Sequence, residues 1–305
     1  MRTDNQAILI RPAATFSFSR RRTIGEALSW GEKTLFHAGN CNARMEALWL
    51  LASATRDPAP ARIFLKRDKS LPGSQNSRYR KHILGRSSGF PLAYLLKSQE
   101  FMGLDFFVDP NVLVPRQETG ILVREALNRI ETGKETRIAD IGTGSGVIAV
   151  SLAKASRKAR ITATDLSAKA LSVARKNARA HGVLEKIQFM QGGLFRPIEG
   201  RPPFDVIVSN PPYVKTSEIW KLQKEIQFEP RLALDGGEDG MKTAAELIRD
   251  SIRFLKRGGV FLMEMGYDQS KRATKLMAES GYLDCRTFKD ESGIDRVAMG
   301  RKTAR

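Results

Sequence analysis

"RIADIGTGSGVIAVSLAKA", which runs from Arg137 to Ala155, is the stretch that decides the fold. Its apolar start predicts a buried strand, its last ten residues predict a helix, and Gly142, Gly144 and Gly146 lie between them. A glycine-rich turn from a strand into a helix lets the backbone approach a ligand at the helix N-terminus. The dinucleotide fingerprint GxGxxG places its third glycine one residue later, so a nicotinamide cofactor is disfavoured.

The same alternation of strand and helix continues to the end of the chain. Strand patterns "RITATD", "IQFMQG", "FDVIVSN" and "GVFLMEMG" alternate with helical patterns such as "SAKALSVARKNARA" and "TAAELIRDSIRFLK". This alternation predicts an α/β fold with a mostly parallel, Rossmann-like sheet and helices on both faces. The final pair, "CRTFKD" and "RVAMGR", predicts an antiparallel edge.

Polar or glycine-rich segments follow four successive predicted strands. The glycine loop follows the first, Asp165 ends the second, "GGLF" (192–195) follows the third and "NPPY" (210–213) follows the fourth. Because ligands of open parallel sheets bind at the carboxyl ends of strands, we expect one site here. Asp165 could accept hydrogen bonds from both hydroxyls of a ribose; taken alone, it could equally cap the following helix.

A different pattern occupies the N-terminal part of the chain. Thr23 followed by Glu26 has the spacing of a capping box, Asn42 can cap a second helix, and two shorter helical patterns flank "SLPG". We therefore expect a small helical domain at 23–90, after a basic and disordered tail at 1–22. Alternating apolar residues around Gly103 predict a β-hairpin linker at 91–115, before the sheet domain at 116–305.

Composition limits the classes of function. Lys and Arg exceed Asp and Glu by 18, which favours acidic partners such as RNA, ribosomes or acidic proteins. Eight of the basic residues lie between Arg62 and Arg86, where a solvated helical face is the alternative explanation. No apolar run approaches the ~20 residues of a membrane span, so we expect no membrane insertion.

Cysteine and histidine content argues against disulfides and metal sites. Cys41 and Cys285 lack the CxxC spacing, and a reducing cytoplasm fits them. The three histidines (His37, His82 and His181) show no ligand spacing, so we expect no metal.

Taken together, these motifs resemble a known family. The D-x-G-x-G-x-G loop, an acid after the second strand and N-P-P-Y after the fourth are similar to class I methyltransferases that use S-adenosylmethionine. "FMGLDFFVDPNVLVPR", "FEPRLALDGGEDG", the "GIDRVAMGR" ending and the helical N-terminal part resemble the HemK/PrmC family of protein-(glutamine-N5) methyltransferases. The resemblance covers roughly Thr23 to Arg301. It implies methylation of the Gly-Gly-Gln loop of peptide chain release factors, with the helical domain docking the substrate.

The resemblance also implies which residues bind the cofactor. The glycine loop would hold the methionine part, Asp165 the ribose and Leu194 the adenine, with Asn210 close by. This chain has Gly193 where relatives usually carry an acid, and "PRQETG" (115–120) lacks the proline and second acid of the commoner P-R-P-E/D-T-E. The full cofactor set is Asp140, Gly142, Thr143, Gly144, Ser145, Gly146, Asp165, Leu194 and Asn210.

On this interpretation the NPPY motif handles the substrate amide. A carboxamide nitrogen is a poor nucleophile, so the site must orient its NH2 group. Asn210 Oδ1 and the Pro211 carbonyl can each accept one amide hydrogen, while the locked φ angles of Pro211 and Pro212 hold both acceptors in place. Tyr213 could then stack on the flat amide. These four residues are the predicted catalytic and substrate-binding set.

Three other functions stay open. A glutamine methyltransferase that acts on a ribosomal protein shares N-P-P-Y; an adenine-N6 methyltransferase of nucleic acids would need to flip its base. A non-catalytic protein that binds S-adenosylmethionine or the ribosome would fit Gly193 and the basic charge. We expect a cytoplasmic monomer with transient contacts to ribosome or RNA; a presequence in the first 22 residues stays open.

Overall fold

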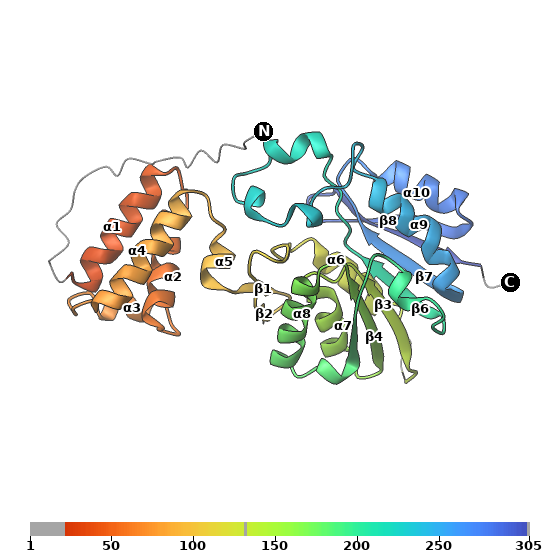
Figure 1. The fold of residues 1–305 in the computed structure, drawn as a ribbon, viewed down its shortest axis with the longest axis horizontal. Helices are drawn as coiled ribbons and strands as arrows, with labels where there is room; N and C mark the ends of the chain where they lie inside the picture. Colours follow the sequence, from red (N-terminus) through yellow and green to blue (C-terminus); the bar gives the residue numbers. More distant parts are fainter. Residues whose placement is uncertain (1–21, 131–132, 304–305) are drawn as a thin grey trace, which may run out of the picture. The chain divides into compact units, whose positions relative to one another are not determined.

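The chain forms two compact units that divide between Ser88 and Gly89, shown in Figure 1. The structure is a computed structural model and describes residues 22–130 and 133–303. Apart from Arg22, the predicted basic tail at 1–22 lies outside the described residues. Each unit has its own buried apolar residues and is described by itself.

The first unit is helical. Its capping box is confirmed, because Thr23 Oγ1 accepts from Glu26 N at 3.2 Å and Glu26 Oε2 accepts from Thr23 N at 2.9 Å. The predicted cap at Asn42 is wrong: Asn42 occupies the N-cap position, but its side chain makes no capping hydrogen bond. The helices are α1 (Ile24–His37), α2 (Ala43–Thr55), α3 (Arg62–Leu65) and α4 (Gly73–Ser87).

A buried ion pair joins α2 to α4 in this unit. Arg86 donates from Nε to Glu46 Oε2 at 2.5 Å and from Nη2 to Glu46 Oε1 at 3.1 Å. The Arg86 side chain is only 9% exposed, so this arginine does not belong to the basic surface that the sequence predicts. The exposed members of that stretch are Arg62, Arg67, Lys69, Arg78 and Lys81.

The second unit begins with the helix α5 (Leu92–Leu96) and the predicted hairpin, β1 (Gln99–Phe101) and β2 (Leu104–Phe106). Met102 and Gly103 both have positive φ angles, of 50° and 76°, as a two-residue turn between antiparallel strands favours. Phe101 and Phe106 are fully buried in the core of the sheet domain. The hairpin therefore packs as part of the second unit.

Within residues 133–303, seven strands form one sheet in the order β5-β4-β3-β6-β7-β9-β8. The first five strands in this order pair in parallel, and β9 and β8 close the edge in antiparallel fashion, which confirms the predicted fold class. The strands are β3 (Thr136–Ile141), β4 (Ala159–Asp165), β5 (Ile187–Gln191), β6 (Phe204–Ser209), β7 (Leu255–Glu264), β8 (Tyr282–Lys289) and β9 (Asp295–Lys302).

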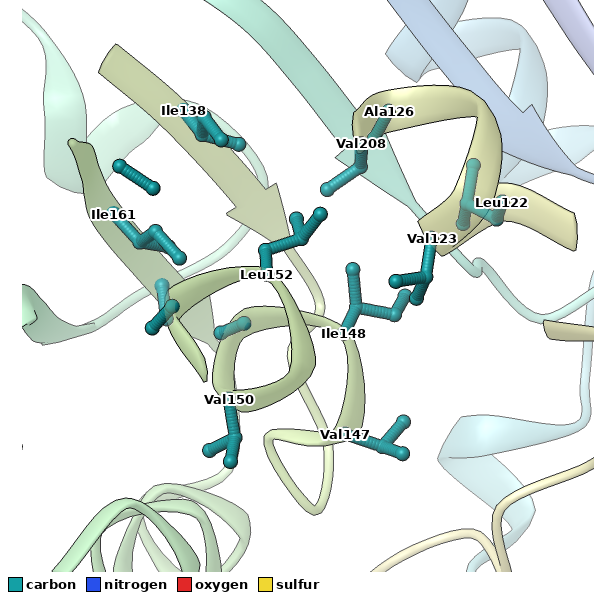
Figure 2. Packing of buried hydrophobic residues seen from close by; sticks show 14 of the residues in the cluster. Leu122, Val123, Ala126, Ile138, Val147, Ile148, Val150, Leu152, Ile161 and Val208 are labelled. Carbon is teal, nitrogen blue, oxygen red and sulfur yellow. The ribbon is translucent and has the colours of Figure 1, made fainter. Parts of the chain in front are cut away.

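Alternate residues of the strands enter two separate cores. Ile138 and Val208 pack with α6 and α7 on one face, as Figure 2 shows, whereas Ala139 and Ile207 pack with α9 and α10 on the other. This division follows from the two-residue period of a strand. The helices are α6 (Thr119–Leu127), α7 (Val147–Ala155), α8 (Ala168–Ala180), α9 (Lys242–Phe254) and α10 (Ser270–Glu279).

The strand order brings the ends of β3, β4, β5 and β6 to one edge of the sheet. The segment after β6 contains only short 3-10 turns, at Thr216–Lys221, Ile226–Phe228 and Arg231–Ala233, before α9 begins. Of the helices in the described ranges, none combines the length and the apolar character that a membrane crossing requires.

Candidate active site

A cavity of about 900 Å³ lies at the carboxyl ends of β3, β4, β5 and β6. It brings together most of the residues that the sequence predicts for the site, but Asp140, Gly146 and Tyr213 are not among its lining residues. The predicted residues that do line it are Gly142, Thr143, Gly144, Ser145, Asp165, Leu194, Asn210, Pro211 and Pro212.

The glycine loop forms one wall of this cavity. Gly142 and Gly144 have φ angles of 76° and 56°, and a Cβ built on either would meet no atom within 4 Å. The backbone is therefore open to a ligand at these two positions. Gly146 serves packing instead, because a Cβ there would lie 3.0 Å from the Ala174 Cβ of α8.

Asp140 lies beneath the loop and is fully buried. Its Oδ2 accepts a hydrogen bond from Thr143 Oγ1 at 2.6 Å. Burial raises the pKa of Asp140 to about 7, against the opposing effect of its hydrogen bonds from Thr143 and the Ala149 backbone. Since Asp140 has no surface on the cavity, its observed role is to shape the loop, and a direct contact with a cofactor stays a prediction.

Asp165 is held by two backbone donors at the end of β4. Its Oδ2 accepts from Gly144 N at 2.9 Å, and its Oδ1 accepts from Ser167 N at 2.8 Å. The N-cap of α8 is Ser167, whose own side chain accepts from Ala170 N, so Asp165 is not the helix cap. Burial raises the pKa of Asp165. Asp165 lines the cavity, its two backbone bonds hold the carboxylate, and the remaining lone pairs can accept from hydroxyl groups.

The loop after β5 forms the adjoining wall with Gly193 and Leu194. Leu194 has a φ of 46°, an uncommon conformation for a bulky residue. A Cβ at Gly193 would meet nothing closer than Leu166 Cδ1 at 3.9 Å, and the φ of Gly193 is not in the left-handed region. A Cβ would therefore be tolerated at position 193.

Asn210 presents an unpartnered acceptor to the site. Its Nδ2 donates to Thr119 Oγ1 at 3.3 Å, whereas its Oδ1 is buried and has no hydrogen-bonding partner among the described residues. Buried acceptors are rarely left without a donor. The structure thus leaves one buried oxygen without a donor, at a residue that lines the cavity.

Glu264 lies at the end of β7, next to the Asn210 and Thr119 side chains. Thr119 and Asn210 are the side chains that can hydrogen bond to its carboxyl group, whose Oε2 has no partner among the described residues, and the residue is only 2% exposed. Burial, opposed by those bonds, raises the pKa of Glu264 to about 7. Glu264 does not line the cavity, so it acts on the site only through its neighbours.

Gln269 ties the backbone of the NPPY segment to two other loops. Its Nε2 donates to Tyr213 O at 3.1 Å and to Gly240 O at 3.0 Å, while its Oε1 accepts from Gly266 N at 2.9 Å. Tyr213 itself is not among the residues that line the cavity, and burial raises its pKa to about 12. The expected stacking of Tyr213 on a substrate amide therefore has no support in this structure.

The glycines of "DGGEDG" pack against the same segment. A Cβ on Gly240, whose φ is 74°, would lie 2.6 Å from Tyr213 O, and one on Gly236 would lie 2.9 Å from Pro212 O. Larger residues would push the NPPY backbone out of place. Hydrogen bonds from Val214 N to Leu234 O and from Gly236 N to Val214 O, of 3.0 and 2.8 Å, join the two segments.

"PRQETG" keeps its contributions to the cavity despite its unusual residues. Arg116 lines the cavity and donates from Nη2 to the buried Glu229 Oε1 at 2.6 Å. Gln117 is exposed and donates to Glu100 O at 3.0 Å, and neither Gln117 nor Gly120 lines the cavity. The departures from the common motif therefore lie outside the site.

Sequence analysis missed Thr119, Glu264 and Gln269. Thr119 begins α6, a helix that was not predicted, and Gln269 lies in a connection without a motif. Glu264 carried a usable signal, because it ends the apolar strand "VFLME" and acids at strand ends face ligand sites in such sheets. Within the described ranges, no three His, Cys, Asp or Glu side chains are grouped so that they could hold a metal ion.

Comparison with known proteins gives consistent matches along the chain. Residues 119–237 match the family model of the methyltransferase small domain, and residues 26–96 match that of the PrmC N-terminal domain. The release factor glutamine methyltransferase of Geobacter sulfurreducens is 39% identical over 92% of this chain and 96% of that protein. The enzyme of the same name from Moorella thermoacetica is 38% identical over 91% of this chain and 98% of that protein.

A solved structure supports the fold. The 16S rRNA N2 G1207 methyltransferase of T. thermophilus, determined with AdoMet and guanosine, has a TM-score of 0.51 and 18% identity. The match covers 67% of this chain and 49% of that one. At this identity the likeness concerns the fold alone, which is that of class I methyltransferases.

Proposed function

The chain belongs to the release factor glutamine methyltransferase family, and from this premise we propose that it methylates the side-chain amide N5 of the glutamine in the Gly-Gly-Gln loop of peptide chain release factors. The observation that carries the proposal is the buried, unpartnered Asn210 Oδ1. A glutamine amide supplies the N–H donor that this oxygen lacks. The protein is thus an enzyme, a methyltransferase that depends on S-adenosylmethionine.

The cavity fits this cofactor. Gly142 and Gly144 leave the loop backbone open, and Asp165 lines the cavity, where we propose that its carboxylate accepts from the ribose hydroxyls. We propose that the loop from Gly142 to Gly146 holds the methionine part and that Leu194 lines the adenine site. When bound, the sulfonium supplies the methyl group: the amide lone pair forms the new N–C bond, the C–S electron pair stays on sulfur, and one nitrogen proton passes to solvent.

The chain's own residues orient the nucleophile. Asn210 Oδ1 and the Pro211 carbonyl can each accept one hydrogen of the substrate NH2 group, which turns the nitrogen lone pair towards the cofactor side of the cavity. Pro211 and Pro212 keep these acceptors in place because their φ angles are locked. No general base is needed, since the nitrogen becomes strongly acidic once it is methylated.

The test offers several substrates at once. The protein is incubated with methyl-labelled S-adenosylmethionine and, in parallel, release factor, ribosomal protein, RNA and DNA. We expect label on release factor alone, and none on a release factor whose Gly-Gly-Gln glutamine is replaced by glutamate. Label on the ribosomal protein or on nucleic acid would replace the proposed substrate, and label on none would contradict the methyltransferase activity.

We further propose that the first unit docks the release factor. Five basic side chains of its 62–86 stretch are exposed, and such a surface attracts an acidic partner. Changing Arg62, Arg67 and Lys69 to glutamate should raise KM for whole release factor but not for a short Gly-Gly-Gln peptide. The matched control reverses three exposed charges of the second unit at the amino ends of strands, at Arg157, Lys158 and Arg160. Equal effects of both triple variants would rule out a dedicated docking surface.

The same basic surface would allow transient contact with ribosome or RNA, and we propose that the enzyme works as a monomer in the cytoplasm. Sedimentation of the purified protein, with and without ribosomes, checks both the assembly state and the contact.

A further inference from the structure

Glu264 is a buried acid that the proposed chemistry does not use. It is 2% exposed, lies outside the cavity lining, and forms no salt bridge with any side chain of the described residues. Burial of a carboxyl group without an ion-pair partner destabilises a fold. Retaining such a group at the edge of an active site indicates that it serves the activity rather than stability.

In each hydrogen bond around Glu264, the donor and the acceptor can be assigned. A charged carboxylate can only accept, so the single hydroxyl proton of Thr119 is donated to Glu264. Thr119 Oγ1 can then only accept from Asn210, whose Nδ2 lies 3.3 Å away. With its NH2 group directed to Thr119 and Glu264, Asn210 must point Oδ1 away from them.

We propose that Glu264 is a positioning residue, which acts on Asn210 directly and through Thr119 to fix the orientation of the Asn210 amide so that Oδ1, and not the NH2 group, meets the substrate. The inference rests on the proposed function and deepens it. Amide oxygen and nitrogen have nearly the same shape, so packing alone cannot choose between the two orientations. The order of donors and acceptors from Asn210 through Thr119 to Glu264 makes that choice.

Removal of the acceptor should reverse the chain. Without Glu264, the Thr119 hydroxyl is free to donate to Asn210 Oδ1, and the Asn210 amide then turns its NH2 group to the substrate. Two donors would face each other, and the substrate nitrogen would lose one of its two acceptors. The productive orientation would fall about tenfold in population, the ratio that one net hydrogen bond sets.

Ionisation of Glu264 provides an independent readout. Its pKa is raised to about 7 by burial, and the charged or titratable groups that face it are Glu118, Arg296 and Tyr213. Below this pKa the protonated carboxyl can donate, so the chain loses its fixed direction. Turnover of the parent should therefore rise with pH through about 7.

The first experiment compares Glu264→Met and Glu264→Gln with the parent, on the short Gly-Gly-Gln peptide. Met has a similar length but no acceptor, so kcat should fall about tenfold and the rise through neutral pH should disappear. Gln carries both an acceptor and a donor, as the protonated carboxyl does, so its kcat should resemble that of the parent below pH 7 and should not change through neutral pH. The affinity for S-adenosylmethionine, measured by calorimetry, should not change in either variant.

The free energy of unfolding distinguishes a positioning role of Glu264 from a structural one. Replacing a buried, unpaired carboxyl by Met should leave the free energy of unfolding unchanged or raise it, while kcat falls. Ser251→Ala is the control: it removes the buried 2.6 Å hydrogen bond to Tyr282 in the same unit, and should lower stability without lowering kcat. Equal kcat for Glu264→Met and the parent would overturn the proposal.

A double-mutant cycle tests the route through Asn210. Because Glu264 acts only on the Asn210 amide, Glu264→Met should have no further effect in an Asn210→Ala background. Additive losses would overturn the proposal even if each single variant is slow. Failure of the parent itself to methylate the peptide or the release factor would contradict the proposed function instead.

Discussion

The two loops that meet in the cavity are held in different ways. The glycine loop is held by side chains at most 32 positions away: Asp140 bonds to Thr143 at three positions, Asp165 to Gly144 at 21 positions, and Asn177 to Ser145 at 32 positions. The NPPY loop depends on Thr119, 91 positions from Asn210, and on Gln269, 56 positions from Tyr213. The proposed cofactor side of the site is thus held by nearer segments of the chain than the proposed substrate side.

The largest effect should come from the substrate side. Asn210→Ala removes the free acceptor and should lower turnover by about 10²–10³, by analogy with loss of one preorganised polar group. The structure places Glu264 against the Asn210 amide, so Asn210→Asp would set two carboxylates together and should be at least as slow. Single-turnover kinetics measure this loss, and calorimetry should show that the variant still binds the cofactor. Turnover of Asn210→Ala within tenfold of the parent would remove the amide from the mechanism.

The corresponding change on the cofactor side is Asp165→Ala. It removes the acceptor for ribose hydroxyls and the bond to Gly144 N, and should weaken S-adenosylmethionine binding by about 1–3 kcal/mol. Asp205→Ala is the control, because Asp205 also accepts from a backbone N–H, that of Arg137, but lies at the start of β6. Calorimetry with equal affinities for the two folded variants would exclude Asp165 from the site.

A matched pair of buried amides sharpens the comparison. Gln269 bonds three backbone groups around the NPPY loop, and Asn177 bonds three others, with Nδ2 to Ser145 O at 2.8 Å and to Phe107 O at 3.0 Å and Oδ1 to Phe107 N at 2.8 Å. Gln269→Met should lower kcat on the peptide about tenfold and leave cofactor affinity unchanged. Asn177→Leu should weaken cofactor affinity and leave kcat on the peptide unchanged. If both variants change the same parameter, the two loops do not act separately.

The smallest expected effect is a gain in cofactor affinity. Position 193 is open and has no left-handed φ, so Gly193→Asp can supply the acceptor that relatives usually carry for the adenine amino group. Cofactor affinity should tighten by about 1 kcal/mol, and kcat at saturation should not change. Gly193→Ser, which offers a neutral oxygen, serves as the comparison. Unchanged or weaker binding of the Asp variant would mean that water or another group already serves the adenine.

Much of the architecture could be predicted from local pattern. Hydrophobic periodicity and the glycine loop identified the parallel sheet, the antiparallel edge and the four strand ends where the site lies, because these signals are local in sequence. The Thr23 capping box was also predictable, since both of its bonds join residues three positions apart. Asn42 shows the limit of such signals: the residue type suited a cap, but no capping bond formed.

The contacts that distant residues make with the site could not be predicted in the same way. By itself, the sequence determined the fold class, the glycine loop, Asp165 and the NPPY acceptors, because each is marked by residue type and spacing. Only the tertiary structure decided that Tyr213 does not line the cavity, that Arg86 is buried against Glu46, and that Thr119 and Glu264 lie beside the Asn210 amide. The physical reason is that a hydrogen bond depends on distance and direction in space, and chain separations of tens of residues carry no information about either until the strands have paired.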